Sequence, residues 1–474
     1  MKREPNYNQH NLGRAQDDHL FFHLRQQLSK LIKSIPKMFK VVGKTLILIL
    51  FVFRLVDSDP KTLPLPSLFA CIDRVRALFS LHTDVDDPRF SNHKIQTFAL
   101  KARIWLTIRT LYYLCISPVW LLLWAIDDFF FPYYRKESLE NSVFIVGGFR
   151  TGSTSLHRAI SLDEERFVSP RFLEIFVPFV SFHKFLDLIE FLDAKLHTKL
   201  VASLEARLQA VVGTECMARH PMTYWEAEED DCLPAGWHFA GWYSSVIFPD
   251  ARCWMKSGEI SKFPPEAQLK LFKFYERALQ KVLYRRGNGR LLLSKSHLIE
   301  FMPILAANLK KVHFVGTVRH PKDTFVSWYA LNQCTALSLA RWKMPTETAA
   351  VAHIKFWESF TNAEIRFFGR KHDRNNKEKD KDKDKDEDEG NNMSKSIVTF
   401  KQYIADQEGT VKRLFKEMGF CMSEKFTKAL REDTQAHVNY KGNRSYENPS
   451  LEDLGVDVNE FEEILKPYIT EFTL

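Results

Sequence analysis

The sequence predicts an α/β domain, in which helices flank a central, mostly parallel sheet, behind an N-terminal membrane-proximal helical region. Residues 137–370 alternate between short apolar runs, typical of buried strands, and longer stretches of helical periodicity. One apolar run leads into a glycine-rich turn, and two others end beside basic side chains, where ligands bind in open α/β sheets. We therefore divide the chain into residues 1–136 and a main domain, 137–474.

Composition limits the classes of protein to which the chain can belong. Of its 474 residues, 45% are hydrophobic and 13% aromatic, enough for a large core. The net charge of +8 lies mostly in residues 1–54, where ten Lys and Arg side chains face three acidic ones. This distribution disfavours a nucleic-acid surface and favours a basic segment beside an anionic membrane. Seven cysteines without a CxxC pair argue against a zinc ribbon, and pairing among Cys216, Cys232 and Cys253 stays open.

Two apolar segments in residues 1–136 indicate membrane association. Residues 45–53 are too short to span a bilayer and fit an interfacial or a core helix. Residues 110–126 carry no charge and have aromatic side chains that suit a membrane interface, although Pro118 lies in their middle. The basic residues before this segment would face the cytoplasm and place the main domain on the other side. The alternative to a single span is a buried or re-entrant helix of a membrane-attached protein.

The first strand of the main domain leads into a cradle for an anion. Val143–Val146 is a continuous apolar run, Gly147 and Gly148 break it, and a helical pattern begins at Ser155. In such a strand, turn and helix, free backbone N–H groups at the helix start point into the turn. Arg150 adds a forked donor that matches a phosphate or a sulfate.

The cradle departs from the P-loop of ATPases and GTPases. Gly147 and Gly152 have the spacing of that loop, but Ser153 stands where its lysine should be. The order of a basic residue, any residue, Gly, Ser and Thr resembles instead the 5′-phosphosulfate loop of sulfotransferases, which use 3′-phosphoadenosine 5′-phosphosulfate (PAPS) as sulfuryl donor. The resemblance implies that the donor is held by Arg150, Thr151, Gly152, Ser153, Thr154 and Ser155. The alternative is a glycine turn that leads into a core helix.

A second group of side chains follows the apolar run Leu291–Leu293. Residues i and i+2 of an extended segment point to the same side, so Lys295 and His297 are expected to converge. The run Lys-Ser-His-Leu, followed by Pro303, resembles the Lys-Thr-His-Leu motif of cytosolic sulfotransferases. By this resemblance His297 is the general base for the acceptor hydroxyl, while Lys295, with Arg150, stabilises charge on the transferring group.

A third group follows the apolar run Val312–Val318. Arg319 stands at its end, Pro321 marks a turn, and a helix carries Ser327 eight residues after Arg319. This pattern resembles the 3′-phosphate signature of PAPS-using enzymes, and it implies that Arg319 and Ser327 bind the 3′-phosphate. Asp323 is expected in the first turn of the helix, near the positive end of its dipole. The alternative role for Arg319 is a salt bridge at the edge of the sheet.

Two further segments resemble the same superfamily less closely. Residues 215–239 resemble an acidic and aromatic region of its broad bacterial and protist branch, and they make Glu228 or a neighbour the alternative to His297 as base. Candidates to line an acceptor pocket there are Trp225, Trp237, His238 and Trp242. Residues 437–446 resemble the loop that closes over the nucleotide, with Lys441 and Arg444 as 3′-phosphate contacts. A glycan at the sequon Asn443-Arg444-Ser445 would conflict with that role.

Three further segments of the main domain have patterns that predict their structure. Residues 371–395 contain a charge run centred on KDKDKDEDE, which cannot bury apolar surface, so we predict a disordered insertion. Phe185–Val212 is predicted as a long amphipathic helix or a helix pair, and Asn459–Phe472 as a closing helix.

These observations together predict a membrane-associated, PAPS-dependent sulfotransferase that needs no metal. It would move the sulfuryl group by in-line displacement to a hydroxyl of a glycan, a lipid or a small molecule. The resemblance to Golgi sulfotransferases implies a luminal domain, and the cytoplasmic face stays open as an alternative. Two other functions remain alternatives: a P-loop kinase or NTPase, which would need Mg²⁺, and a non-catalytic membrane scaffold. No nucleic-acid partner is expected, and the oligomeric state stays open.

Overall fold

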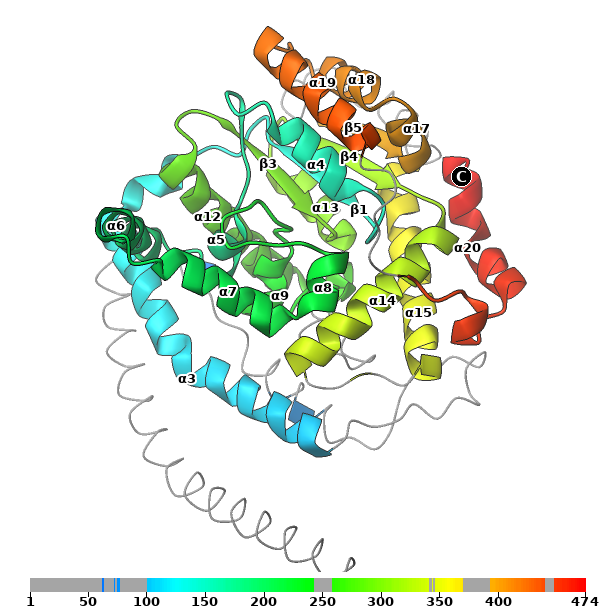
Figure 1. Cartoon of the computed structure of the whole chain (residues 1–474), viewed down its shortest axis with the longest axis horizontal. Coiled ribbons are helices and arrows are strands. Elements are labelled where there is room, and N and C mark those ends of the chain that lie inside the picture. Colours follow the sequence, from blue (N-terminus) through cyan, green and yellow to red (C-terminus); the bar gives the residue numbers. More distant parts are fainter. Residues whose placement is uncertain are drawn as a thin grey trace, which may run out of the picture.

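A five-stranded parallel sheet forms the centre of the structure, a computed structural model (Figure 1). The structure describes residues 100–242, 258–340, 346–369, 393–439 and 447–474, with isolated positions at 62, 63, 72, 75, 76 and 343. The strand order is β2-β3-β1-β4-β5, and all neighbours are parallel. The strands are β1 (Val143–Gly147), β2 (Phe167–Val168), β3 (Leu291–Ser296), β4 (His313–Val318) and β5 (Ser394–Thr399). The predicted α/β class is confirmed.

Helices precede, connect and follow the strands. Before β1 lie α3 (Leu100–Phe130) and η3 (Pro132–Lys136). Between β1 and β3 lie α4 (Ser153–Ser161), α5 (Phe172–Phe176), α6 (Val180–Leu196), α7 (Leu200–Val212), α8 (Thr214–Arg219), α9 (Cys232–His238), η4 (Ile260–Lys262) and α12 (Pro265–Arg286). The later ones are η5 (Ile299–Phe301), α13 (Met302–Asn308), α14 (Pro321–Ala340), α15 (Thr346–Phe368), α17 (Phe400–Ala405), α18 (Gln407–Glu417), α19 (Glu424–Asn439), η8 (Glu452–Leu454) and α20 (Val458–Phe472).

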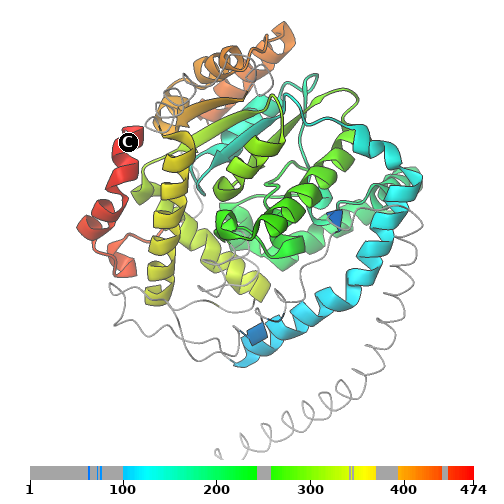
Figure 2. The same cartoon turned by 180° about the vertical axis from the view of Figure 1, so that it is seen from behind.

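The central strand β1 is apolar throughout because both of its faces are covered. Val143 and Ile145 belong to a buried cluster with side chains of α4, α18 and α19. Phe144 and Val146 point the other way, into a larger cluster with side chains of α12, α13, α15 and α20. Helices therefore cover both faces of the sheet, as the two opposite views show (Figures 1 and 2).

Most predicted elements are present with shifted ends. The first helix of the main domain starts at Ser153, two residues earlier than expected, and β3 continues through Lys295 to Ser296. The stretch predicted as one long helix or a pair is the pair α6 and α7, and the closing helix is α20. The predicted end of the insertion, at residue 395, was wrong because β5 begins at Ser394. Residues 45–53 and 371–392, Lys441 and Arg444 lie outside the described residues.

The long helix α3 is held against the domain at its C-terminal end. The Asp127 carboxylate accepts hydrogen bonds from the Val180 and Ser181 N–H groups, at 2.7 and 2.8 Å. It also lies 3.1 Å from the ammonium nitrogen of Lys281 on α12. Among the described residues, α3 is the one helix long and apolar enough to cross a membrane. Its contacts with α6, α14 and η3 favour a helix that packs on the domain over a separate span.

The described cysteines contain no disulfide. Cys216, Cys232 and Cys334 are buried and form no disulfide with one another, while Cys253 lies outside the described residues. A pair between Cys216 and Cys232, which the sequence left open, is therefore not formed.

Candidate active site

The carboxyl ends of β1, β3 and β4 meet at one cavity of about 830 Å³. Its wall includes Phe149, Arg150 and Gly152–Ser155 after β1, His297 after β3, and Arg319 after β4. Pairing of β1 with both β3 and β4 brings these three segments together, although they are far apart in the sequence. The volume falls within the roughly 300–1,000 Å³ typical of small-molecule sites.

The turn after β1 has a backbone that only certain residues tolerate. Arg150 has a φ of 68° and Gly152 a φ of 96°, both in the left-handed region. A Cβ atom on Gly152 would lie 2.7 Å from the ring of Phe400, so this glycine is needed for space as well as for conformation. Gly152 caps α4, whose first N–H groups have no partner within the helix. The turn thus presents backbone donors and the positive end of a helix dipole to the cavity.

Three side chains from two sequence segments converge beside this turn. Arg150 Nε donates a hydrogen bond to Ser327 Oγ at 2.9 Å, and Arg319 Nη1 donates one to the Arg150 carbonyl oxygen at 3.4 Å. The Arg319 guanidinium carbon lies 4.2 Å from the centre of the Phe400 ring and forms an ion pair with Asp323 at 3.4 Å. All of these side chains line the cavity, so its wall carries two guanidinium groups next to the turn.

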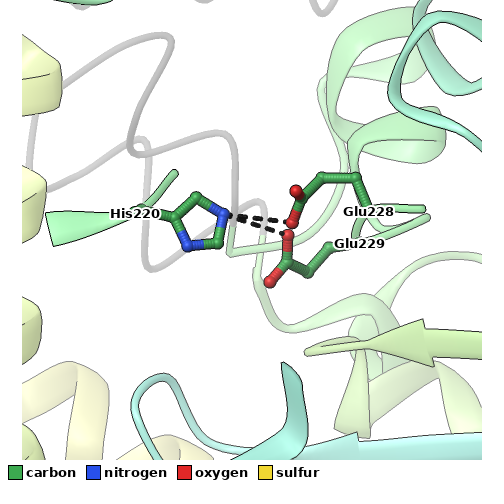
Figure 3. A group of neighbouring side chains, drawn as sticks. All are labelled: His220, Glu228 and Glu229. Atoms are coloured by element: carbon green, nitrogen blue, oxygen red, sulfur yellow. Dashed lines mark hydrogen bonds and ion pairs between the residues drawn. The ribbon is translucent and has the colours of Figure 1, made fainter. Parts of the chain in front are cut away.

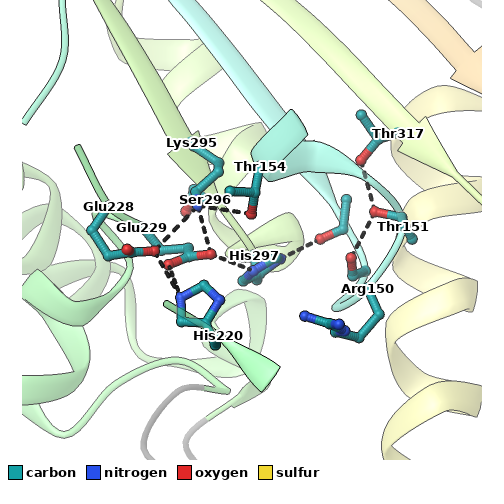
Figure 4. A network of polar contacts seen from close by, with 12 residues as sticks. Arg150, Thr151, Thr154, His220, Glu228, Glu229, Lys295, Ser296, His297 and Thr317 are labelled. Atoms are coloured by element: carbon teal, nitrogen blue, oxygen red, sulfur yellow. Dashed lines mark hydrogen bonds and ion pairs between the residues drawn. The ribbon is translucent and has the colours of Figure 1, made fainter. Parts of the chain in front are cut away.

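Lys295 lies at the centre of a buried ionic network (Figure 4). Its ammonium nitrogen lies 2.7 Å from Glu229 and 3.3 Å from Glu228, and it donates a hydrogen bond to Thr154 Oγ1 at 3.1 Å. Burial alone would lower the pKa of Lys295, but the two carboxylates raise it above its usual value. Burial likewise opposes ionisation of Glu229, yet the Lys295 charge holds the pKa of that carboxyl well below its usual range. Both partners are therefore charged at neutral pH.

His297 is oriented by a backbone carbonyl. Its Nδ1 donates a hydrogen bond of 2.6 Å to the carbonyl oxygen of Gly147, and its ring packs 4.1 Å from the Phe149 ring. This tautomer leaves Nε2, which lies 3.6 Å from Glu229, as the proton acceptor. Burial lowers the pKa of His297, but Glu229 and Asp231 more than compensate, so that the pKa is raised. As expected from their spacing, Lys295 and His297 meet at one spot, the Glu229 carboxylate.

The two glutamates also contact His220, which makes a compact group (Figure 3). His220 Nε2 lies 3.0 Å from Glu228 and 3.7 Å from Glu229. Against the effect of burial, the two carboxylates raise the pKa of His220 to about 9. Among the described residues, this is the one group whose ligand atoms could hold a metal ion. A cation there would have to compete with the Lys295 ammonium, which lies against the same two carboxylates.

The acidic segment Glu228–Asp231, which holds the alternative base Glu228, is enclosed by the domain. All four side chains are buried, because the segment lies along the part of the β3 edge that the two-residue strand β2 does not cover. There the Asp230 N–H donates to the Lys295 carbonyl oxygen at 3.0 Å, and the Asp230 carboxylate accepts from Tyr275 at 2.9 Å. Burial raises the pKa of Asp230 and of Asp231 to about 7.

The other end of the cavity is apolar. It lies between α5, α7, α8 and α14 and is lined mainly by Phe172, Phe176, Leu208, Val212, Met222 and Leu331. Two residues of α3, Arg109 and Tyr113, complete the wall on that side. The cavity thus joins a cationic end to an apolar one.

Some predicted site residues do not line the cavity. The Thr151 hydroxyl donates to the Gly148 carbonyl oxygen at 2.7 Å and contacts Thr317 Oγ1 at 2.8 Å, so it stabilises the turn from behind. Lys295 is likewise behind the wall and reaches the cavity through Thr154 and Glu229. Trp237 and Trp242, suggested as acceptor contacts, pack in the hydrophobic core instead.

Two solved structures resemble the chain. The sulfotransferase STF1 of Mycobacterium tuberculosis matches with a TM-score of 0.53 and 16% sequence identity, over 89% of this chain and 97% of the other. The sulfotransferase STF9 of Mycobacterium avium matches with a TM-score of 0.55 and 14% identity, over 89% of this chain and 95% of the other. No protein-family model and no curated protein matches the sequence. The chain therefore has the α/β fold of these sulfotransferases, as its motifs predicted.

Proposed function

We propose that the protein is a sulfotransferase that moves the sulfuryl group of PAPS to a hydroxyl group of an acceptor. The observation that carries the proposal is the meeting of three separate motifs at one cavity, on a fold shared with two sulfotransferases. The sequence alone predicts the turn Arg150–Ser155, His297, and the pair Arg319 and Ser327 as site residues, and the three motifs lie far apart along the chain. A chance set of polar residues has no reason to share one wall. A luminal location stays a prediction of the resemblance alone.

The residues of the cationic end have the chemistry to bind the donor. The free N–H groups of Gly152–Ser155 and the Arg150 guanidinium suit the 5′-phosphosulfate, because both offer donors to a diffuse anion. Arg319 and Ser327 suit the 3′-phosphate, and Lys441 and Arg444 remain candidates for further contacts to it. Gly152 has no Cβ, and the Phe400 ring beside it leaves no space for one, so the backbone stays open to the ligand.

His297 is the proposed base. PAPS supplies an activated sulfuryl group whose leaving group is 3′-phosphoadenosine 5′-phosphate (PAP). The sulfur–oxygen bond to the acceptor forms as the bond to the phosphate oxygen breaks, and the acceptor proton passes to Nε2 of His297. The Gly147 carbonyl fixes the required tautomer, and Glu229 stabilises the imidazolium that forms. Glu229 itself is the weaker candidate for the base, because Lys295 lowers its pKa.

Arg150 and Lys295 supply positive charge near the leaving group. Arg150 lines the cavity directly. Lys295 acts through Thr154, because its ammonium group donates to Thr154 Oγ1 and leaves the hydroxyl proton free to donate into the turn.

A transfer assay on the full chain tests the proposal. The chain is incubated with ³⁵S-labelled PAPS and with acceptors of three classes, a glycan, a lipid alcohol and a phenol, in the presence of EDTA. We expect label to move to one class, and His297→Gln to lower the rate by about 10²- to 10⁴-fold. Arg413→Ala, which removes an exposed guanidinium paired with Glu417, is the matched control and should transfer at the normal rate.

A parallel assay without EDTA, with γ-³²P-labelled Mg·ATP beside the labelled PAPS, separates the two alternatives. Transfer or hydrolysis of the γ-phosphate of Mg·ATP, without any use of PAPS, would identify a kinase or an NTPase. Binding of PAP without transfer to any acceptor class would identify a scaffold that has kept the fold.

A further inference from the structure

The helix α3 is apolar on its outer side as well as on its buried side, where Leu106, Leu121 and Trp124 pack against the domain. Thr110, Ser117 and Asp127 are buried against the domain. Ile104 and Ile108, one turn apart, are 41% and 44% exposed and belong to a stripe of apolar side chains along the outer side. A helix on a water-soluble surface carries polar side chains on its outer side. The outer side of α3 therefore suits an apolar environment.

Helices α6 and α7 continue this pattern. Phe185, Leu188 and Leu192 form an exposed stripe on α6, at spacings of three and four residues. Leu204 and Val211 are exposed on α7. α6 contacts both α3 and α7, so the three helices are neighbours on one side of the molecule (Figure 1). We call the exposed apolar side chains of α3, α6 and α7 the apolar face.

Residues 180–212 carry four basic and four acidic side chains, and the basic ones are the more exposed. Within residues 180–212 the exposed basic side chains are Lys184, Lys195, Lys199 and Arg207. The one exposed acidic side chain in that range, Asp187, is paired with Arg285 at 2.9 Å. Exposed leucine and phenylalanine beside exposed lysine and arginine are the combination that binds an anionic membrane surface.

The apolar end of the cavity reaches this face. Val211 lines the cavity and is also 61% exposed, so the cavity opens beside α7. Arg109 and Tyr113 of α3 line the same end. A molecule that enters the cavity from the apolar face through this opening meets apolar side chains first and the turn Arg150–Ser155 last.

We propose that the apolar face lies on an anionic lipid bilayer and that its opening admits a membrane-resident lipid alcohol as the sulfuryl acceptor. The acceptor class rests on the proposed function, whereas the membrane contact does not. The hydroxyl of such a lipid reaches His297 while its apolar body stays between α5, α7 and α14. Because α3 is held to the domain through Asp127, it lies on the bilayer with α6 and α7 and does not cross it.

Flotation of the full chain with vesicles tests the membrane contact. The chain should float with vesicles of phosphatidylcholine and phosphatidylserine, and less with phosphatidylcholine alone. A double variant, Leu188→Ser with Leu192→Ser, should bind at least about tenfold more weakly for each leucine removed from lipid. Ile404→Ser is the matched control, because Ile404 is 46% exposed on α17, on the opposite side of the molecule from α3 (Figure 1).

Equal flotation of the double variant and the wild type would overturn the membrane contact. So would a wild type that does not float. A double variant that melts at a lower temperature would then show that residues 1–99 of the same chain cover the face. A wild-type dimer that the double variant converts to a monomer would show that a second copy covers it.

Label transfer tests the acceptor class. ³⁵S-labelled PAPS is added with vesicles that contain hexadecanol or cholesterol, or with glucose in solution. We expect label in the lipid extract, and a loss of that label in Val211→Arg, which places a charge at the opening. Calorimetric titration with PAP should be the same for Val211→Arg and the wild type.

Label on glucose alone would overturn the lipid acceptor, as would no labelled lipid from a chain that binds PAP. A chain that floats but does not bind PAP would instead contradict the proposed function and leave the membrane contact standing.

Discussion

The two ends of the cavity are built in different ways. At the cationic end, strand register brings together side chains that are held by specific partners, such as Lys295 between Glu228 and Glu229. At the apolar end, helices that are distant in the sequence enclose a space lined mainly by apolar side chains. The cationic end therefore holds polar groups at fixed positions, whereas the apolar end provides an apolar lining. Substitutions should therefore lower the free energy of unfolding strongly at the cationic end and only slightly on the apolar face beside the other end.

The largest effect is expected from Lys295→Met. It leaves two buried carboxylates with His220 as their remaining cation, and removal of one partner from a buried ion pair costs about 3–5 kcal/mol. Urea unfolding measures the loss. The control is Lys262→Met, which removes an exposed pair with Glu259 and should cost about 0–1 kcal/mol. Equal losses in the two variants would show that the Lys295 network does not stabilise the fold.

The next effect is a fall in stability with rising pH. The folded-state pKa of His220 is raised from 6.5 to about 9, so its contribution is complete below pH 6.5 and is lost as the pH rises through about 9. Across this interval we expect the free energy of unfolding to fall by roughly 2–3 kcal/mol. The raised pKa values of Asp230 and Asp231 act in the same direction at lower pH.

His220→Asn isolates this contribution. Urea unfolding at several pH values should give a flatter profile between pH 6.5 and about 9 for this variant than for the wild type. His197→Asn changes an exposed histidine and should leave the slope as it is. An unchanged slope in His220→Asn would mean that the two glutamates do not hold its proton.

A smaller effect is expected from Gly152→Ala. The variant places a Cβ against Phe400 in a left-handed backbone, at a cost of about 1–3 kcal/mol, and it should weaken PAP binding as well. Gly419→Ala is the matched control, because Gly419 has a φ of 75° with open space around its Cβ position. It should cost only about 1–2 kcal/mol and leave PAP binding alone. Normal PAP binding by Gly152→Ala would contradict the assignment of this turn to the donor.

The smallest effect is expected on the apolar face. Leu188 is 52% exposed, and Leu188→Ser should change the free energy of unfolding by no more than about 0.5 kcal/mol. Leu279, on α12, is fully buried, and Leu279→Ala should cost about 2–5 kcal/mol. A large loss of stability in Leu188→Ser would show that the face is covered in the free protein.

The same contrast explains what could be predicted from the sequence. The strand Val143–Gly147, its turn and α4 were predictable because their signals are local: an apolar run, glycines and a helical period. Lys295 and His297 were predictable as a pair because they are two residues apart in a strand. The spacing of Arg319 and Ser327 likewise lies within one strand, turn and helix.

The buried acidic segment could not be predicted because its burial depends on which strand edge it covers. A signal was nevertheless present: a lysine inside an apolar strand needs a buried counter-charge. Glu228 and Glu229 lie in an acidic run, residues 226–231, that is flanked by the apolar residues Trp225 and Leu233. The run lies between the turn after β1 and the strand that carries Lys295. The orientation of α3 was also beyond the sequence, since the helix is apolar on both sides: Trp124 is buried, whereas Ile108 is exposed.

Calorimetric titration of the full chain with PAP and with AMP tests the central claim most directly, because the two ligands differ only in the 3′-phosphate. We expect clear preference for PAP without Mg²⁺, and a loss of about 10- to 150-fold in PAP affinity in Arg319→Ala, as for a hydrogen bond to a charged group. AMP affinity should be unchanged in that variant. Equal affinity for PAP and AMP, or a preference for Mg·ATP, would contradict the donor site and the sulfotransferase function with it.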